Sequence, residues 1–190
     1  MPGDIKQIIL EVKNGSHEAF RKLVENFQSY AYSLSFRILC QKQDAEDVVQ
    51  EGFIKIWKHI GQYDPKQKFT TWMYKIITNT ALDKLKSEKR SRFTSLSGNH
   101  IENMLKSDDD TVQSMVNREL GAIIHTLAGH LPEKQKLVFI LRDLQGLSSE
   151  ETQEILDISE TSVKSNLYHA RQLIRKQLEH MMEKTKGGIA

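Results

Sequence analysis

The stretch that decides the fold runs from Leu147 to Gln177 and reads LSSEETQEILDISETSVKSNLYHARQLIRKQ. Ser148 is followed three residues later by Glu151, a capping-box pattern that predicts the start of a helix. Residues 157–158 interrupt this helix, and Ser159 is placed to cap a second one. The stretch therefore predicts a short helix, a tight turn and a longer helix.

The longer helix has two chemically different faces. Apolar residues at spacings of three and four predict one buried face, made of Val163, Leu167, Ala170, Ile174 and Leu178. Basic and hydroxyl side chains follow the opposite face, at Lys164, Ser165, Tyr168, Arg171 and Arg175. Such a pair of helices is what a helix-turn-helix needs to enter a DNA major groove. An ordinary helical hairpin with a solvated charged face is the alternative.

The composition is typical of a soluble globular protein with one or two domains, with 27% charged and 38% hydrophobic residues in 190. The net charge is only +2, so any nucleic-acid surface must come from local clusters. The single cysteine, Cys40, excludes an intramolecular disulfide and a cysteine-rich zinc site. No apolar run approaches the ~20 residues of a membrane span. Charges also interrupt the N-terminal region where a signal peptide has its apolar core, so we expect a cytoplasmic protein.

Outside this stretch, apolar residues recur at helical spacing through most of the chain, and no stretch alternates as a strand would. Four helices are predicted before residue 91, with a loop at 61–65 between the third and fourth. Polar residues then dominate to about residue 110, apart from a short helical turn expected at 101–105. We predict an all-α protein of two small helical domains joined by a flexible linker. The expected ranges are 1–91 for the first domain, 92–112 for the linker, 113–182 for the second domain with the helix-turn-helix, and 183–190 for a tail.

The third predicted helix begins with acidic residues and no base, at Asp44, Glu46, Asp47 and Glu51. Acidic side chains near a helix N-terminus are favoured by the helix dipole, which explains this pattern without any function. An acidic docking face for a basic partner explains it equally well.

The fourth predicted helix carries a polar and aromatic face. Its members follow at spacings of three and four: Trp72, Lys75, Asn79, Asp83, Lys86 and Arg90. Further bases gather at its end, and Tyr63 and Phe69 lie in or beside the preceding loop. Rings that stack on bases and lysines that hold phosphates suit an unstacked single strand. An asparagine can also bind one base edge, although core packing of Trp72 remains the alternative.

Three parts of the chain, in the same order, resemble parts of one protein family. Residues 44–57, DAEDVVQEGFIKIW, closely resemble the polymerase-binding segment of sigma-70-family sigma factors. Residues 69–76, FTTWMYKI, and 79–83, NTALD, resemble the −10-recognition segment of the extracytoplasmic-function (ECF) group. Residues 131–133, LPE, 144–148, LQGLS, and the helix-turn-helix resemble that group's −35-reading domain. The resemblance covers nearly the whole chain.

The resemblance implies a sigma factor that binds core RNA polymerase and directs initiation at promoters. Its polymerase-binding face would be formed by Asp44, Asp47, Gln50, Glu51 and Phe53. The opened −10 strand would be bound by Tyr63, Phe69, Trp72, Lys75, Asn79, Asp83, Lys86, Lys89 and Arg90. The −35 duplex would be read by Ser162, Lys164, Ser165, Asn166, Tyr168, His169, Arg171 and Arg175.

The resemblance also implies partners. These are core RNA polymerase, promoter DNA and an anti-sigma protein, which is often membrane-bound in this family. We expect a monomer when free, with no cofactor, no metal site and no catalysis of its own. An autonomous helix-turn-helix regulator remains the alternative function, and a helical-bundle enzyme lacks any motif in its favour.

Three positions depart from what the family or the helix predicts. Asn166 and His169 stand where relatives often carry arginine, which weakens the predicted phosphate contacts. Gly52 lies inside the predicted docking helix, where glycine is less favourable than alanine by ~1 kcal/mol. A close approach of the backbone to a partner would explain Gly52, as would sequence drift.

Overall fold

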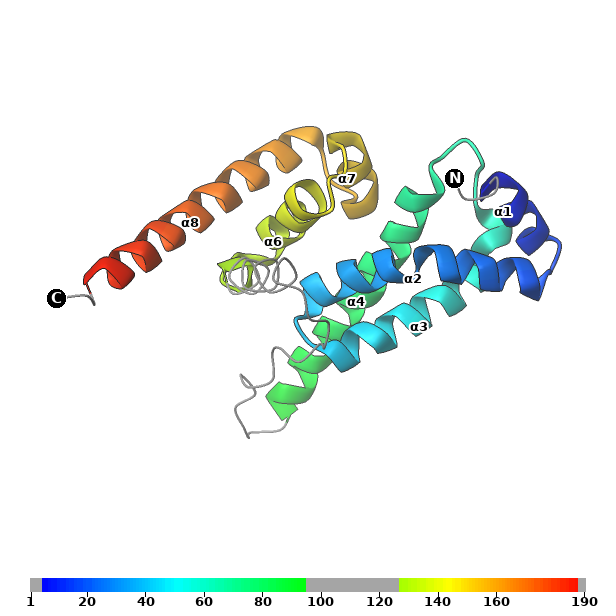
Figure 1. The fold of residues 1–190 in the computed structure, drawn as a ribbon, viewed down its shortest axis with the longest axis horizontal. Coiled ribbons are helices and arrows are strands. Elements are labelled where there is room, and N and C mark those ends of the chain that lie inside the picture. The colour runs from blue at the N-terminus through cyan, green and yellow to red at the C-terminus, as the bar shows by residue number, and fades with distance from the viewer. Residues whose placement is uncertain (1–4, 95–126, 188–190) are drawn as a thin grey trace. The chain divides into compact units, whose positions relative to one another are not determined.

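The computed structural model describes residues 5–94 and 127–187, and every regular element in these ranges is helical. The chain divides into two compact units, Met1–Met104 and Leu105–Ala190. Figure 1 shows the elements of both units along the chain. The predicted all-α fold is therefore confirmed, whereas most of the predicted linker and its helical turn at 101–105 lie outside the described residues.

The first unit is a helical bundle of α1 (Ile5–Lys13), α2 (His17–Leu39), α3 (Lys42–His59) and α4 (Phe69–Thr94). A short 3-10 turn, η1 (Ile60–Gln62), follows α3. In Figure 1 α2 and α3 run side by side, and both pack against α4. Fully buried side chains fill the space between these three helices: Leu23, Leu34, Ile38, Val48, Ile56, Met73 and Ile77.

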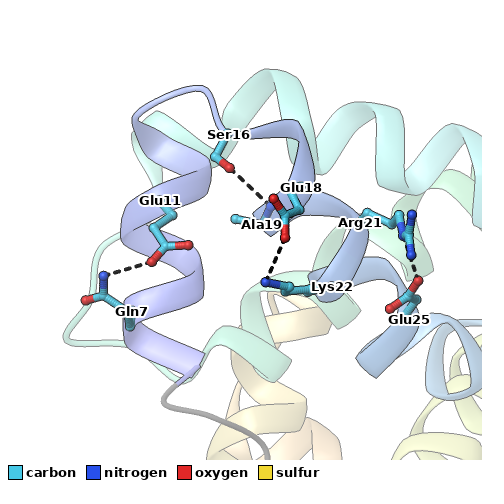
Figure 2. Close-up of polar contacts among 8 residues, drawn as sticks. All are labelled: Gln7, Glu11, Ser16, Glu18, Ala19, Arg21, Lys22 and Glu25. Carbon is cyan, nitrogen blue, oxygen red and sulfur yellow. Dashed lines mark hydrogen bonds and ion pairs between the residues drawn. The ribbon is translucent and has the colours of Figure 1, made fainter.

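The start of α2 is fixed by local hydrogen bonds (Figure 2). The Ser16 hydroxyl accepts a hydrogen bond from the Ala19 N–H at 3.2 Å, as its position in the sequence predicts. Ion pairs one turn apart follow on the exposed side, between Glu18 and Lys22 at 3.1 Å and between Arg21 and Glu25 at 3.0 Å. Each such pair supports the helix by a few tenths of a kcal/mol, ~0.2–0.5.

The break between α2 and α3 is shorter than the polar residues around 41–43 predict. Cys40 ends α2 in the left-handed conformation, with φ 66°, and its N–H donates to the Phe36 carbonyl at 2.8 Å. Gln41 alone then separates this residue from α3, which begins at Lys42 rather than at residue 44 or 45. The left-handed Cys40 and Gln41 therefore suffice to connect the two helices, without a longer loop.

Gly52 on α3 packs directly against the Ile77 side chain of α4. The residue is buried, and a Cβ placed on it would overlap the Cδ1 of Ile77 on α4. The structure offers a third explanation for this glycine, a close approach to the chain's own fourth helix. Glycine at this position lets the Ile77 side chain pack directly on the α3 backbone.

The second unit contains α6 (Glu133–Phe139), a π-helical turn η2 (Ile140–Leu144), α7 (Ser149–Leu156) and α8 (Glu160–Gly187). Residues 127–129, just before α6, are also helical. Its core contains Leu127, Ala128, Leu131, Val138, Phe139, Val163, Leu167, Ala170 and Ile174. The predicted buried face of α8 is thus confirmed for four of its five members. The prediction that Leu178 is buried was wrong, since this residue lies on the part of α8 beyond the core and is 38% exposed.

Candidate functional site

The acidic start of α3 is paired with a base from α4. The Lys84 Nζ lies 3.1 Å from the Asp44 Oδ1 and 3.2 Å from the Asp47 Oδ2. These hydrogen bonds, to Asp44 first and then to Asp47, raise the pKa of Lys84 above its ordinary value. Two of the five predicted docking residues, Asp44 and Asp47, therefore form a three-membered charge cluster with Lys84 that joins two helices.

The remaining docking candidates differ in how far they reach the surface. Gln50 and Glu51 are exposed, and the Glu51 Oε1 lies 2.7 Å from the Lys55 Nζ. Phe53 is only 5% exposed and packs edge-on against the Phe20 ring, so it supports the face from below. The neighbouring Ile54 is 53% exposed and is the apolar side chain that a partner can reach.

The loop between α3 and α4 is held by a cluster of rings. Tyr63 and Phe69 are both buried, and their rings meet edge-on with centroids 5.6 Å apart. Trp72 is half-buried and lies within 5.9 Å of both rings, while Phe27 from α2 packs against Phe69. This arrangement gives the loop a rigid aromatic wall, of which Trp72 is the most accessible part.

Polar contacts fix Tyr63 further. Its hydroxyl donates to the Gln67 carbonyl at 2.6 Å, and its own carbonyl accepts from the Lys13 Nζ at 2.7 Å. Burial, together with the nearby Asp64 carboxylate, raises the pKa of the Tyr63 phenol. The Lys13 ammonium also lies 5.5 Å from the centre of the Tyr63 ring. The loop conformation is therefore set by α1 as well as by α4.

The polar face predicted along α4 is present. Asn79, Asp83 and Lys86 are exposed, and Lys75 is half-buried. Asn79 is the amide on this face, about two turns beyond Trp72. The side chains of Lys89 and Arg90, which complete the predicted set, lie outside the described ones.

The helix-turn-helix of the second unit is built as its sequence predicts. The Ser148 Oγ accepts from the Glu151 N–H at 3.1 Å, and the Glu151 Oε2 accepts from the Ser148 N–H at 2.7 Å. Asp157 ends α7 in the left-handed conformation, with φ 53°. The Ser159 hydroxyl then accepts from the Ser162 N–H at 3.2 Å. The caps thus mark the starts of α7 and α8, and the left-handed Asp157 lies in the turn between them.

The first turns of α8 present most of the predicted −35 set to solvent. Lys164, Ser165, Tyr168 and His169 are exposed, with Tyr168 at 60%. The Asn166 amide is turned back onto its own helix, where it donates to the Ser162 carbonyl at 2.8 Å and to the Ser162 hydroxyl at 3.2 Å. Lys164 pairs with Glu160 at 2.7 Å, and this contact raises the pKa of Lys164.

Arg171 is held by a residue of another element. Its Nε and Nη2 donate to the two carboxylate oxygens of Asp143 in η2, at 2.8 and 2.6 Å. This forked contact raises the pKa of Arg171 and ties α8 to η2, the turn that follows α6. Arg175 forms a looser pair with Glu179 at 3.4 Å. Of the two predicted arginines, Arg171 is thus the one with a structural partner from another helix.

Sequence reasoning overlooked several residues of these surfaces. The bases near the end of the fourth helix were predicted only as a group, and the pairing of Lys84 among them depends on how α3 packs against α4. Gln172 donates to the Tyr168 hydroxyl at 2.7 Å, and its spacing of four from Tyr168 could have revealed this contact. Ile54 could have been found as the apolar residue out of phase with the buried stripe of its helix.

Within 5–94 and 127–187 no group of three or more metal-ligating side chains comes together. In the same ranges no helix has the length and apolar character needed to cross a membrane.

Comparisons with known proteins find the same family in both halves of the chain. The sigma-70 region 2 family matches residues 23–91, and the sigma-70 region 4 family matches residues 121–174. The ECF RNA polymerase sigma factor SigW of Bacillus subtilis is 31% identical over 183 residues, covering 93% of this chain and 98% of the relative. The ECF RNA polymerase sigma-E factor of Haemophilus influenzae is 32% identical over 181 residues, covering 92% and 95%.

Solved structures have the same fold. CnrH in complex with the cytosolic domain of CnrY matches with a TM-score of 0.68 at 19% identity, covering 93% of this chain and 99% of that one. The sigma factor RpoE of Bartonella quintana, in complex with the anti-sigma factor NepR, also matches at 0.68, with 16% identity and coverages of 84% and 96%. The sequence relatives, which match almost end to end, decide the family. This chain belongs to the ECF group of the sigma-70 family of RNA polymerase sigma factors.

Proposed function

We propose that this protein binds core RNA polymerase and directs it to promoters with two elements. The −35 element is read as duplex by the helix-turn-helix, and the −10 element is read as an opened strand by the first unit. The observation that carries the proposal is that each family match contains exposed polar surfaces of the right chemistry. These surfaces are the α3–α4 faces within residues 23–91 and the start of α8 within residues 121–174.

The start of α8 is suited to a major groove. Lys164, Ser165, Tyr168 and His169 are exposed on a helix whose start is capped by Ser159. Hydroxyl and basic side chains can contact base edges and phosphates, and the Tyr168 ring offers apolar contact to a thymine methyl group. We therefore assign −35 recognition to this face, with Asn166 and Ser162 supporting the helix backbone behind it.

The face of α4 is suited to a single strand. Asn79 can donate to and accept from one base edge, and Trp72 exposes part of a ring that is braced by Tyr63 and Phe69. Moving a base out of the stack costs a few kcal/mol, which such contacts can partly offset. In this assignment Tyr63 and Phe69 act by holding the wall of the base pocket, whereas Lys75, Asp83, Lys86, Lys89 and Arg90 flank the strand.

The start of α3 is suited to a basic partner surface. Asp47, Gln50 and Glu51 are exposed on consecutive turns, with Asp44 beside them and Phe53 packed beneath. We assign this face to the coiled coil of the polymerase's largest subunit. Ile54 gives it an exposed apolar contact, which interfaces commonly bury at their centre.

The proposed division of labour follows the sequence ranges. Residues 1–91 would hold polymerase and the −10 strand, 113–182 the −35 duplex, and 92–112 would connect them. The protein would act in the cytoplasm, where polymerase is found, without a cofactor or catalysis of its own. The two solved structures named above are complexes with other proteins, one of which is an anti-sigma factor, and we propose a regulator of that class here.

The assignment of α4 can be tested with two asparagine variants of the purified protein. Asn79→Ala should lose selectivity for −10 sequences while retaining core polymerase binding, because it removes one base contact from an exposed face. Asn26→Ala on α2, which is also exposed, is the matched control and should behave as wild type. The readout is run-off transcription from templates that vary only in the −10 element. Equal selectivity in Asn79→Ala and wild type would contradict the assignment.

A further inference from the structure

We propose that Lys84 is a built-in competitor for the acidic face of α3, and that it limits how tightly a basic partner binds there. The proposal rests on the polymerase docking proposed above and adds a residue that tunes its strength. Lys84 lies on α4, outside the docking helix, and was not among the predicted docking residues.

The geometry places one ammonium group between two docking carboxylates. The Lys84 Nζ lies 3.1 Å from the Asp44 carboxylate and 3.2 Å from the Asp47 carboxylate. Lys84 is on α4, 37 residues after Asp47 in the sequence. Side-chain exposures are 32% for Lys84, 23% for Asp44 and 48% for Asp47, so solvent and a partner can reach the cluster. A cation arriving at Asp47 therefore meets a carboxylate that is already paired.

The ion pairs of Lys84 with Asp44 and Asp47 should add little to the stability of the fold. Ion pairs that water can reach contribute little to folding, because the two charges are well solvated when apart. The contact between α3 and α4 is secured instead by the close approach of Gly52 to Ile77 and by buried apolar side chains. The main consequence of Lys84 is therefore electrostatic: it cancels one of the two negative charges that Asp44 and Asp47 present.

A second lysine makes a similar contact further along the face. Lys55 lies 2.7 Å from Glu51 and donates to the Thr80 hydroxyl at 3.1 Å. Each of the three acidic side chains assigned to docking is thus paired with a lysine inside the unit. A basic partner must displace these lysines or share the carboxylates with them, and nearby like charges oppose its approach.

If Lys84 competes with the partner, removing its charge should strengthen binding to core polymerase. Lys84→Met keeps the aliphatic stem and removes the charge, so it should tighten core polymerase binding by roughly threefold to tenfold at low salt. The gain should come mostly from faster association and should shrink as salt is raised, because charge steering is screened. In an Asp44→Asn/Asp47→Asn background the same substitution should give a smaller gain, because Lys84 then has no carboxylate to occupy and only its repulsion of a basic partner remains.

The experiment titrates labelled full-length protein with purified core polymerase at several NaCl concentrations. Lys22→Met is the matched control, because it removes the same charge from a pair with Glu18 on α2 (Figure 2). Tighter binding by Lys84→Met, with no change in Lys22→Met, is the expected result. Unchanged or weaker binding by Lys84→Met, with a wild-type circular dichroism spectrum and melting temperature, would overturn the competitor role.

Comparison of the variants distinguishes failure of the competitor role from failure of polymerase docking at α3. If wild type binds and the double asparagine variant binds more weakly, docking at α3 stands, whatever Lys84→Met does. If the double asparagine variant binds as wild type does, the docking face is elsewhere, and the competitor role falls with it. Absence of binding by wild type would overturn both.

Discussion

At the scale of single residues, the structure contains a strained position that the sequence does not mark. Cys40 adopts φ 66° at the end of α2, a conformation that L-residues with a Cβ disfavour by ~1–2 kcal/mol. Glycine is the usual residue there, because it reaches this conformation without a steric penalty. A left-handed cysteine is not predictable from composition, since nothing local distinguishes it from a helical one.

Cys40→Gly should therefore stabilise the first unit by roughly 0.5–1 kcal/mol. Urea unfolding followed by circular dichroism would measure the change as a higher midpoint. Cys40→Ala serves as the control, because it removes the thiol and keeps the Cβ. If Ala raises the midpoint as much as Gly does, backbone strain is not the cause.

Packing against Ile77 explains why residue 52 is a glycine. Replacing glycine by alanine within a helix normally gains ~1 kcal/mol, but here the new Cβ would overlap the fully buried Ile77 side chain. We expect Gly52→Ala to destabilise the protein by ~1–2 kcal/mol, consistent with overpacked cores. Since valine lacks the Cδ1 atom, Ile77→Val should relieve the overlap.

The check is a double-mutant cycle in urea. Gly52→Ala should be harmful in wild type and close to neutral in the Ile77→Val background, and Gly61→Ala, which meets open space, should be close to neutral. An equal loss in both backgrounds would mean that the close approach to Ile77 is not what requires glycine.

At the scale of elements, the contact between η2 and α8 has a measurable strength. The Asp143–Arg171 pair is forked and links two elements, whereas Arg175–Glu179 is a single contact within one helix. The first pair should therefore show a coupling energy of ~0.5–1 kcal/mol and the second ~0.3 kcal/mol. Alanine double-mutant cycles of both pairs in urea give these values. Equal coupling in the two pairs would contradict a tie between elements by Arg171.

Helix starts were predicted well where a side chain caps them. Ser148 with Glu151, and Ser159, cap as their spacing predicts, and Ser16 caps α2 in the same way. The start of α3 was predicted too late, because Gln41 makes no side-chain cap. The π-helical turn at Ile140–Leu144 was not predicted, since its i→i−5 bond from Gln145 to Ile140 depends on how α6 meets α7 and α8. Local chemistry thus identifies capped ends, and packing decides the others.

The candidate site divides in the same way. The exposed positions on α4 and α8 follow from helical period, so Asn79, Lys164 and Tyr168 could be placed from the sequence. The contacts of Lys84 and Arg171 with acids far along the chain could not, because they depend on tertiary packing. Phe53, Tyr63 and Phe69 were assigned to binding sets, and their burial became visible only once the helices were packed.

At the scale of the whole molecule, the balance of charge bears on how the protein finds DNA. With a net charge of +2, and with Arg171 and Lys164 already paired, the free protein should bind duplex weakly. Polymerase that holds the first unit would raise the effective concentration of the second at the promoter. We therefore expect duplex binding to the protein alone to be at least roughly tenfold weaker than binding in the presence of core polymerase. Fluorescence anisotropy with a −35 duplex, with and without core, measures this.

The central claim is promoter-selective initiation, and run-off transcription from a promoter library with purified core polymerase tests it most directly. Core polymerase alone should give background, and adding the protein should give transcripts from a subset of templates that share a −35 and a −10 sequence. Asp47→Arg should abolish this selection by placing a positive charge on the docking face. If the wild-type protein neither binds core nor starts selective transcripts, yet binds duplex DNA tightly alone, the account is contradicted and an autonomous regulator takes its place.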